Sequence, residues 1–366
     1  MKILNISLEK KLFLAESKAQ QRVLDYARLF ERFDLIVLTS RGYKSVEFEN
    51  MLIVPTNSFT KFFYLIKAYF LGKKMIRKYE HNIISAQDPF EIGLAAWLLA
   101  RKYKLKLQIQ IHGDFFSSLY WHRESFLNRL RYYLGKFLIK KADSVRVVSN
   151  RIKESLIKLD LAPEKIVVVP IYSLISNKNL IIEDKKEGNK FIFLTVSRLV
   201  SVKNISLQIQ AMKEIVKNYS NTELWIAGDG PERKKLEKES KKLKIEKNIK
   251  FLGWQDNLEK FYMEADVFLL TSNYEGWGMA IIEAASFGLP IIMTDVGCAG
   301  EIIKNEESGI IIPVGDKKAL AAAMTKLIQN KNFGKKMGEQ AQRTVLSLPN
   351  QEQNLVLYKK SFNNLE

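Results

Sequence analysis

The sequence NYEGWGMAIIEAASFGLP occupies residues 273–290 and follows the apolar run VFLL at residues 267–270. The run has the length and flanks of a buried parallel strand. Gly276 and Gly278 allow a tight turn in which backbone N–H groups can approach a ligand, and residues 279–287 suit a helix. A strand, a glycine turn and a helix start form an anion site, because unpaired N–H groups and the positive end of the helix dipole converge there.

Two carboxylates lie in this stretch. Glu275 enters the turn, and Glu283 is the only charged residue between Gly276 and Asp295. A carboxylate in such apolar surroundings is costly unless it has a hydrogen-bonding partner. Two interpretations are open. Glu283 is a structural residue bonded to backbone donors, or both Glu residues accept hydrogen bonds from the hydroxyl groups of a ligand.

The two Glu residues, separated by seven positions within EGWGMAIIEAASFGLP, resemble the signature of retaining glycosyltransferases of family 4. The resemblance covers most of the chain and is strongest from residue 191 to residue 313. It implies a GT-B architecture, which is an α/β fold of two facing Rossmann-like, doubly wound domains with parallel sheets and an interdomain cleft. The expected domains are residues 1–172, which bind the acceptor and receive a terminal helix at 350–366, and residues 190–349, which bind the nucleotide sugar.

Composition limits the class of protein. A chain of 366 residues, 47% hydrophobic and 27% charged, is long enough for two globular α/β domains. The single Cys298 excludes an internal disulfide and a cysteine zinc site, which favours a reducing, cytoplasmic compartment. No segment resembles a signal peptide or a membrane span of ~20 apolar residues. The formal charge of +18 calls for an anionic partner: phosphates, an acidic membrane or nucleic acid.

The first half of the chain alternates strand and helix patterns, which predicts a doubly wound parallel sheet. No G-x-G-x-x-G follows the first strand, which argues against an NAD-binding opening. Strands are expected at residues 2–7, 34–39, 82–86, 105–111, 144–148 and 166–169, and helices at residues 19–31, 92–102 and 151–159.

The candidate catalytic histidine and the acceptor-binding candidates lie in this half. His112 directly follows the strand at 105–111, and ligands bind at the carboxyl ends of strands in a parallel sheet. The family resemblance implies that this His lies beside the donor sugar. Where relatives carry a glycine pair in the first strand–helix loop, this chain has Lys18 and Arg22, which are either hydrogen-bond donors or solvated surface charges. Asp114 and Ser149 also follow strand ends and are weaker candidates.

The second half restarts with a strand at 191–196, after a linker expected at residues 171–190. Arg198 and Lys203 lie between this strand and a helix that Asn204 or Ser206 would cap. Guanidinium and ammonium groups both favour phosphate oxygens, although cations on a loop are ordinarily solvated. The pair resembles the Arg/Lys pair with which the family neutralises the leaving nucleotide.

The resemblance thus implies catalytic roles for His112, Arg198, Lys203 and Glu275. It also implies a donor-binding set in which Glu283 holds the ribose and backbone groups approach the nucleotide and sugar. That set comprises Glu283, Gly276, Trp277, Gly278, Met279, Gly228, Gly253 and Trp254.

The sequence therefore predicts a retaining glycosyltransferase that moves a hexose from a nucleotide sugar to a glycan or lipid-linked acceptor, in the synthesis of cell-surface polysaccharide or glycolipid. Neither a metal nor another cofactor is expected, because the two cations occupy the role of a metal and no Asp-x-Asp triplet appears. Two rivals remain. One is a nucleotide-dependent oxidoreductase or epimerase on a Rossmann fold, and the other is a nucleic-acid-binding protein, which charge alone suggests and no motif supports.

Two basic, aromatic stretches predict that the first domain docks on the anionic inner face of the cytoplasmic membrane. Residues 61–79 contain Lys and Arg residues and no acid, and residues 120–141 contain the single acid Glu124. Basic side chains mixed with aromatic ones are typical of a helix in the headgroup region of a bilayer. Trp121 is one of the aromatic side chains in the second stretch. The alternatives are that the aromatic side chains are core residues and the cations are merely solvated, or that the cations bind a soluble anionic glycan.

Overall fold

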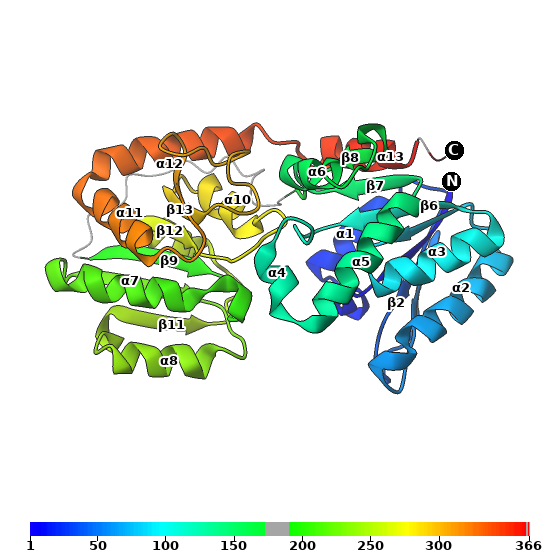
Figure 1. The fold of residues 1–366 in the computed structure, drawn as a ribbon, viewed down its shortest axis with the longest axis horizontal. Helices are drawn as coiled ribbons and strands as arrows, with labels where there is room; N and C mark the ends of the chain where they lie inside the picture. Colours follow the sequence, from blue (N-terminus) through cyan, green and yellow to red (C-terminus); the bar gives the residue numbers. More distant parts are fainter. Residues whose placement is uncertain (173–189, 364, 366) are drawn as a thin grey trace. The chain divides into compact units, whose positions relative to one another are not determined.

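The computed structural model describes residues 1–172, 190–363 and 365. The chain divides into two compact units (Figure 1): Met1–Pro170 with Glu352–Glu366, and Ile171–Gln351. The C-terminal segment therefore belongs to the first unit, and the chain passes from one unit to the other after Pro170 and Gln351. Residues 173–189 of the expected linker lie outside the described residues.

The first unit is built on an eight-stranded sheet with the order β3-β4-β2-β1-β5-β6-β7-β8. Neighbouring strands are parallel, except for the antiparallel β3–β4 pair. This arrangement confirms the doubly wound parallel sheet. The strands are β1 (Lys2–Ser7), β2 (Arg32–Val37), β3 (Val46–Phe48), β4 (Met51–Pro55), β5 (Ile83–Ala86), β6 (Lys106–Ile111), β7 (Ser144–Val147) and β8 (Ile166–Val168).

Helices cover both faces of this sheet. Helices α2 and α3 pack on one face, with α5 against α3 (Figure 1). Helices α1 and α13 share the core of the other face, where Tyr358 and Phe362 join Ile3, Leu35 and Val37. The helices are α1 (Lys18–Ala27), α2 (Tyr64–Tyr79), α3 (Glu91–Tyr103), α4 (Leu119–Glu124), α5 (Phe126–Lys141), α6 (Asn150–Ile157) and α13 (Gln351–Asn363), with short 3-10 turns η1 (Lys10–Phe13), η2 (Lys61–Phe63) and η3 (Pro163–Lys165).

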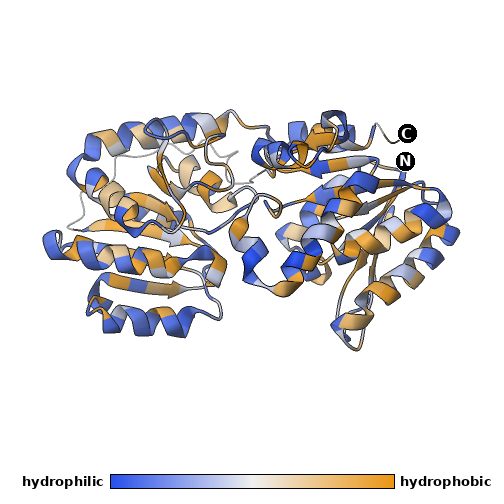
Figure 2. Ribbon diagram, viewed as in Figure 1, coloured by the Kyte–Doolittle hydropathy of each residue, from blue (hydrophilic) through white to orange (hydrophobic). Residues whose placement is uncertain are grey.

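The second unit has a six-stranded parallel sheet with the order β11-β10-β9-β12-β13-β14. The ribbon of its strands is mostly hydrophobic in colour, whereas helix α8 is mostly hydrophilic (Figure 2). The elements are β9 (Phe191–Val196), β10 (Thr222–Ala227), β11 (Ile249–Gly253), β12 (Val267–Leu270), β13 (Ile291–Thr294), β14 (Gly309–Ile312), α7 (Ile205–Asn218), α8 (Arg233–Lys242), α9 (Glu259–Glu264), α10 (Met279–Ser286), α11 (Lys317–Gln329), α12 (Lys331–Leu346), η4 (Ser201–Lys203) and η5 (Glu246–Asn248).

Strand β2 begins at Arg32, earlier than the expected start at residue 34. The charged residues at its start are satisfied inside the fold, so they do not end the strand. Asp34 accepts hydrogen bonds from Arg32 Nε (2.7 Å), from Leu52 N (2.8 Å) and shares a contact of 2.9 Å with His81 Nε2. The β3–β4 hairpin, which follows, was not predicted.

Asn204 occupies the expected N-cap position of α7 with a φ of 48°, but its side chain does not cap the helix. Its amide group instead donates to Asn273 Oδ1 (3.4 Å), while the Ser206 hydroxyl donates to Glu239 (2.7 Å). Asn204 therefore joins two loops rather than capping a helix.

Candidate functional site

The strand order of the second unit reverses between β9 and β12, since β10 and β11 continue on one side and β13 and β14 on the other. Ligands of open parallel sheets bind at the carboxyl ends of the strands at such a point. The loops after β9 and β12 meet there. Asn273 N donates to Val202 O (2.7 Å), and the Thr271 hydroxyl donates to Lys203 O (3.2 Å).

Lys203 and Glu275 form an ion pair at this switch point. The hydroxyl of Ser272 donates to the same carboxylate oxygen, Glu275 Oε1, at 2.8 Å. Both charged side chains are largely buried, with 20% and 14% of their surfaces exposed. Arg198, in the same loop as Lys203, is exposed. The sequence assigned Lys203 and Glu275 to different parts of the donor, and the structure brings their side chains into contact.

Glu283 lies within α10 and is half-buried. Its Oε2 accepts a hydrogen bond of 3.0 Å from the Tyr262 hydroxyl of α9. Burial and the nearby Glu283 raise the pKa of Tyr262 well above its usual value, so the hydroxyl keeps its proton. This contact gives Glu283 a side-chain donor, which neither sequence-based interpretation named.

The turn before α10 is held by backbone contacts. Cys298 N donates to Trp277 O (3.0 Å), and Gly278 has a φ of 95°. A side chain at Gly297 would meet Glu275 Cβ and Trp277 O at 2.9 Å, so only glycine allows this approach. Trp277 is 3% exposed, which leaves its backbone rather than its ring for a ligand. Gly276 is buried, and Met279, the first residue of α10, is half-buried.

The backbone conformation and close packing after β10 require glycine at residue 228. Gly228 has a φ of 135°, and a Cβ atom there would lie 1.9 Å from Ser197 O. Gly228 N donates to Gly253 O (2.7 Å), so this carbonyl group of the expected base-binding segment is engaged. Trp254 is 60% exposed, and its indole N–H lies 3.3 Å from Asp256 Oδ1.

The strand order of the first unit reverses between β1 and β5. The Ser7 hydroxyl donates to Gln87 Oε1 across this switch point at 2.6 Å. His112 follows the next strand, β6, and is half-buried. Desolvation and the positive charges of Arg146 and Arg22 lower the pKa of His112 to about 3. The imidazole is therefore neutral at physiological pH and can donate one hydrogen bond and accept another.

The acceptor-binding candidates fall into two groups: two side chains on α1, and two side chains that are held by local hydrogen bonds. Lys18 and Arg22 lie on α1, with Lys18 exposed and Arg22 half-buried. Asp114 is 6% exposed, and its carboxylate accepts from the hydroxyl and the backbone N–H of Ser117. Ser149 is fully buried and accepts from Ile152 N (3.3 Å) as the cap of α6. These contacts favour structural roles for Asp114 and Ser149.

Sequence reasoning missed several residues at these two edges. Asp88 follows β5, accepts from Phe90 N (2.8 Å), and has a pKa raised to about 7 by burial. Ser272 and Tyr262 contact the two Glu residues. A polar residue just after a strand was the available signal for Asp88 and Ser272. Tyr262 had none, because its contact comes from a separate helix.

Two family models match the chain. The model for Glycosyltransferase Family 4 matches residues 19–171, and the model for Glycosyl transferases group 1 matches residues 177–344. The chain belongs to the family 4 type of glycosyltransferases. This membership confirms the resemblance and decides against an oxidoreductase or epimerase.

Known proteins similar to this glycosyltransferase include two curated enzymes and one solved structure. N-acetyl-alpha-D-glucosaminyl L-malate synthase of Bacillus anthracis is 29% identical over 250 residues, which are 66% of this chain and 63% of that protein's length. UDP-Gal:alpha-D-GlcNAc-diphosphoundecaprenol alpha-1,3-galactosyltransferase of Escherichia coli is 27% identical over 275 residues, 70% of this chain and 69% of that protein. Sucrose-phosphate synthase from Thermosynechococcus elongatus matches with a TM-score of 0.82 at 19% identity, over 100% of this chain and 99% of that one, which shows the GT-B fold.

Proposed function

We propose that this glycosyltransferase moves a hexose from a nucleotide sugar to a glycan or lipid-linked acceptor, with retention of configuration and without a divalent metal. The observation that carries the proposal is the Lys203–Glu275 ion pair at the switch point of the second unit, with Arg198 in the same loop as Lys203. Two cations there suit a diphosphate, and a carboxylate beside them suits sugar hydroxyls.

The cations would act on the leaving group. Negative charge grows on the nucleoside diphosphate as the glycosidic bond breaks, and donors that are already in position stabilise this charge without reorganisation. The contact with Glu275 and the largely buried ammonium group hold Lys203 in place. Arg198 would add a planar, bidentate donor from the same loop. Together they would supply the charge that a metal supplies elsewhere.

Glu283 would accept hydrogen bonds from the ribose hydroxyls. The Tyr262 hydroxyl, 3.0 Å from Glu283 Oε2, would fix the orientation of the carboxylate. The backbone around Gly276, Trp277, Gly278 and Met279 would approach the donor sugar, and the segment from Gly253 to Trp254 would approach the base. His112 would contact a sugar hydroxyl as a neutral imidazole, which adds no positive charge beside a developing oxocarbenium ion.

The acceptor class rests on the relatives. The Escherichia coli galactosyltransferase is named for a diphosphoundecaprenol acceptor. We therefore place this chain in the synthesis of a cell-surface polysaccharide or glycolipid, acting at the cytoplasmic face of the membrane.

Thermal-shift screening tests the donor. Each of a panel of nucleotide sugars is added to the wild-type protein and to Glu283→Gln. A ligand at 100 times its Kd adds ~2.7 kcal/mol to the free energy of unfolding, so one donor should raise Tm in the wild type and less in the variant. No response to any nucleotide sugar would contradict the proposal.

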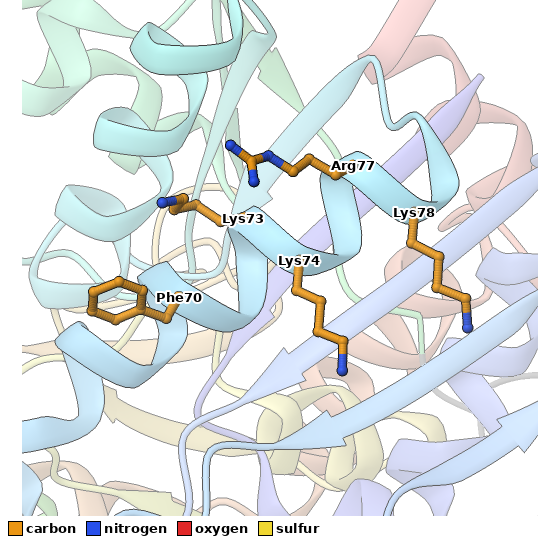
Figure 3. A pocket seen from close by; sticks show the side chains of 5 residues that line it. All are labelled: Phe70, Lys73, Lys74, Arg77 and Lys78. Atoms are coloured by element: carbon orange, nitrogen blue, oxygen red, sulfur yellow. The ribbon is translucent and has the colours of Figure 1, made fainter.

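Membrane docking is the second part of the proposal, and the surface of α2 supports it. Phe62, in the turn η2 just before α2, and Phe70 of α2 are 80% and 61% exposed, and Ile66 lies between them in the sequence. Beyond Phe70 the helix presents Lys73, Lys74, Arg77 and Lys78 in pairs around a surface hollow (Figure 3). No helix in the described part of the chain is long and apolar enough to cross a bilayer. An apolar end beside a basic face suits a helix that lies in the headgroup region.

Helix α5 repeats the pattern in part. Phe126 and Tyr133 are 72% and 68% exposed, and Leu130 lies between them. Arg131, however, pairs with Glu91 at 2.7 Å. The docking prediction counts Trp121 among the interfacial aromatic side chains of residues 120–141, but Trp121 is 4% exposed and stacks on Phe90, so that part of the prediction was wrong.

Co-sedimentation with vesicles tests the docking. A Lys73→Gln, Lys74→Gln, Arg77→Gln variant is compared with a control of equal charge, Lys234→Gln, Lys238→Gln, Lys241→Gln on the exposed helix α8. Each cation near an anionic leaflet is worth ~1 kcal/mol, so the α2 variant should bind phosphatidylglycerol vesicles roughly 100-fold more weakly. Equal loss in both variants, or equal binding to neutral vesicles, would contradict docking through α2.

A further inference from the structure

A buried guanidinium lies under the carboxyl edge of the first sheet. Arg146 is 2% exposed and donates to Gln110 Oε1 (2.9 Å) and to Val169 O (3.4 Å). Its Cζ lies 4.9 Å from the centre of the Tyr358 ring, and its Nε has no hydrogen-bond partner among the described residues. Arginine stays charged in proteins, and a buried charge is costly unless it is paired. Among the residues that the structure describes, no carboxylate pairs with Arg146.

Arg22 supplies a second cation near the same place. It lies on α1 one helical turn before Tyr26, whose ring stacks on Tyr358 with 3.8 Å between the centroids. In the described chain Arg22, like Arg146, has no acidic partner. The stacked rings of Tyr26 and Tyr358 thus connect Arg22 to Arg146, and the charges of both cations lower the pKa of His112. The three side chains therefore lie around a common point.

This point lies at the switch point of the first unit. Helix α1 follows β1, and His112 follows β6, the strand next to β5. Because α1 connects parallel strands, its N-terminus faces the carboxyl ends of those strands. The ten-residue helix thus adds the positive end of its dipole there, with Ser17 as its cap. Positive charge from two side chains and one helix therefore converges where a ligand of this unit would bind.

We propose that Arg22 and the first turn of α1 bind an oxyanion of the acceptor, a phosphate or a carboxylate, beside His112 and with the buried Arg146 as a second charge behind them. This inference rests on the proposed function, because it states that the acceptor substrate of that transfer carries a negative charge. An acceptor that offers hydroxyl groups alone would leave both guanidinium groups without a counter-charge. The diphosphate of the donor has its own cations, Arg198 and Lys203, in the other unit.

His112 reports on this site directly. The chain has only three histidines, so the imidazole resonances can be assigned by NMR with a His112→Gln variant. An anion bound beside His112 should shift its resonance and raise its pKa, because it favours the charged imidazole. Inorganic pyrophosphate and succinate are the two probes. Tighter binding of pyrophosphate would indicate a phosphorylated acceptor, and tighter binding of succinate a carboxylate acceptor; either result supports an oxyanion site.

The decisive variant is Arg22→Gln, with Arg28→Gln at the other end of α1 as the matched control. Loss of one charge-assisted contact should weaken the His112 response about tenfold or more in Arg22→Gln and leave it unchanged in Arg28→Gln. The proposal is overturned if neither anion moves the His112 resonance, or if Arg22→Gln binds the anion as tightly as the wild type.

The outcome is separable from that of the proposed function. The Lys203→Ala variant should lose transferase activity and keep the His112 response, because the two sites lie in different units. A normal His112 response in a protein that turns over no nucleotide sugar would leave the oxyanion site standing and contradict the proposed function. Turnover of a nucleotide sugar without any His112 response would support the proposed function and contradict the oxyanion site.

Discussion

Glu283 holds a carboxylate in an otherwise apolar helix, with the Tyr262 hydroxyl 3.0 Å from its Oε2. Glu283→Gln keeps the shape and an acceptor for Tyr262 but removes the charge. A hydrogen bond to a charged group contributes ~1.5–3 kcal/mol, so nucleotide affinity should fall about 10- to 100-fold while Tm changes little. Calorimetric titration with the nucleoside diphosphate measures this. Unchanged affinity together with a lower Tm would show that Glu283 is structural.

Lys203 is predicted to act on the rate more than on donor binding, because the leaving-group charge grows in the transition state. Lys203→Ala should lower kcat roughly 100-fold or more, as loss of an oxyanion donor does. The change also leaves Glu275, 14% exposed, without its cation. Stability should therefore fall as well, and a second change, Glu275→Gln, should restore part of it but none of the activity. Near wild-type turnover by Lys203→Ala would refute the catalytic role.

Asp88 makes stability depend on pH. Burial raises its pKa from 3.8 to about 7 in the folded protein, so ionisation between these values costs the folded state more than the unfolded one. This cost is absent below the lower value and complete above the higher one. Asp88→Asn, which can still accept from Phe90 N, should therefore add about 1–3 kcal/mol to the free energy of unfolding above pH 7, and less as the pH falls. Urea unfolding of both proteins at pH values from below the lower pKa to above the higher one measures this difference. A gain that does not change with pH would contradict the assignment.

At the donor site, sequence reasoning identified the charged residues but not the side chains that contact them. Glu275, Glu283 and Lys203 stand out because each is a charge in a loop or helix beside buried strands. Their contacts with Ser272 and Tyr262 follow from how α9 and the β12–α10 loop pack, and no local pattern encodes that packing.

At the scale of the elements, we expect changes in the core of α13 to destabilise the first unit strongly. Tyr358 is 1% exposed, stacks on Tyr26 and lies beneath Arg146. Tyr358→Ala should cost ~3–5 kcal/mol, in the range for an aromatic side chain removed from a core. Tyr358→Phe keeps the ring and should cost ~1 kcal/mol or less, because the hydroxyl makes only a long contact of 3.5 Å with Gln110. Denaturant unfolding of both variants gives the comparison, and equal costs would show that the ring does not carry the packing.

Element prediction succeeded where the apolar pattern was unbroken. The strands β1, β9 and β12 have the bounds that the sequence predicts. Strand β2 was placed too late because Arg32 and Asp34 are charged, and the contacts of Asp34 with Arg32 and His81 are visible only in three dimensions. The β3–β4 hairpin was missed because its strands are short.

At the scale of the whole molecule, the structure shows where some of the basic residues behind the formal charge of +18 lie. Basic residues gather on α2, the charges of Arg22 and Arg146 lower the pKa of His112, and Arg198 and Lys203 lie in the loop at the switch point of the second unit. Composition predicted an anionic partner but could not divide the charge among a surface, an acceptor and a donor. That division follows from which strand ends and helix faces carry the residues.

The central claim is tested most directly by the release of nucleoside diphosphate from a panel of nucleotide sugars, with a lipid-linked acceptor and EDTA present. The wild type should turn over at least one donor, with retention of configuration in the product, and added manganese should not be needed. Lys203→Ala should turn over the same donor roughly 100-fold more slowly. Activity that EDTA abolishes and manganese restores, or equal turnover by the wild type and Lys203→Ala, would contradict a metal-independent transfer supported by these cations.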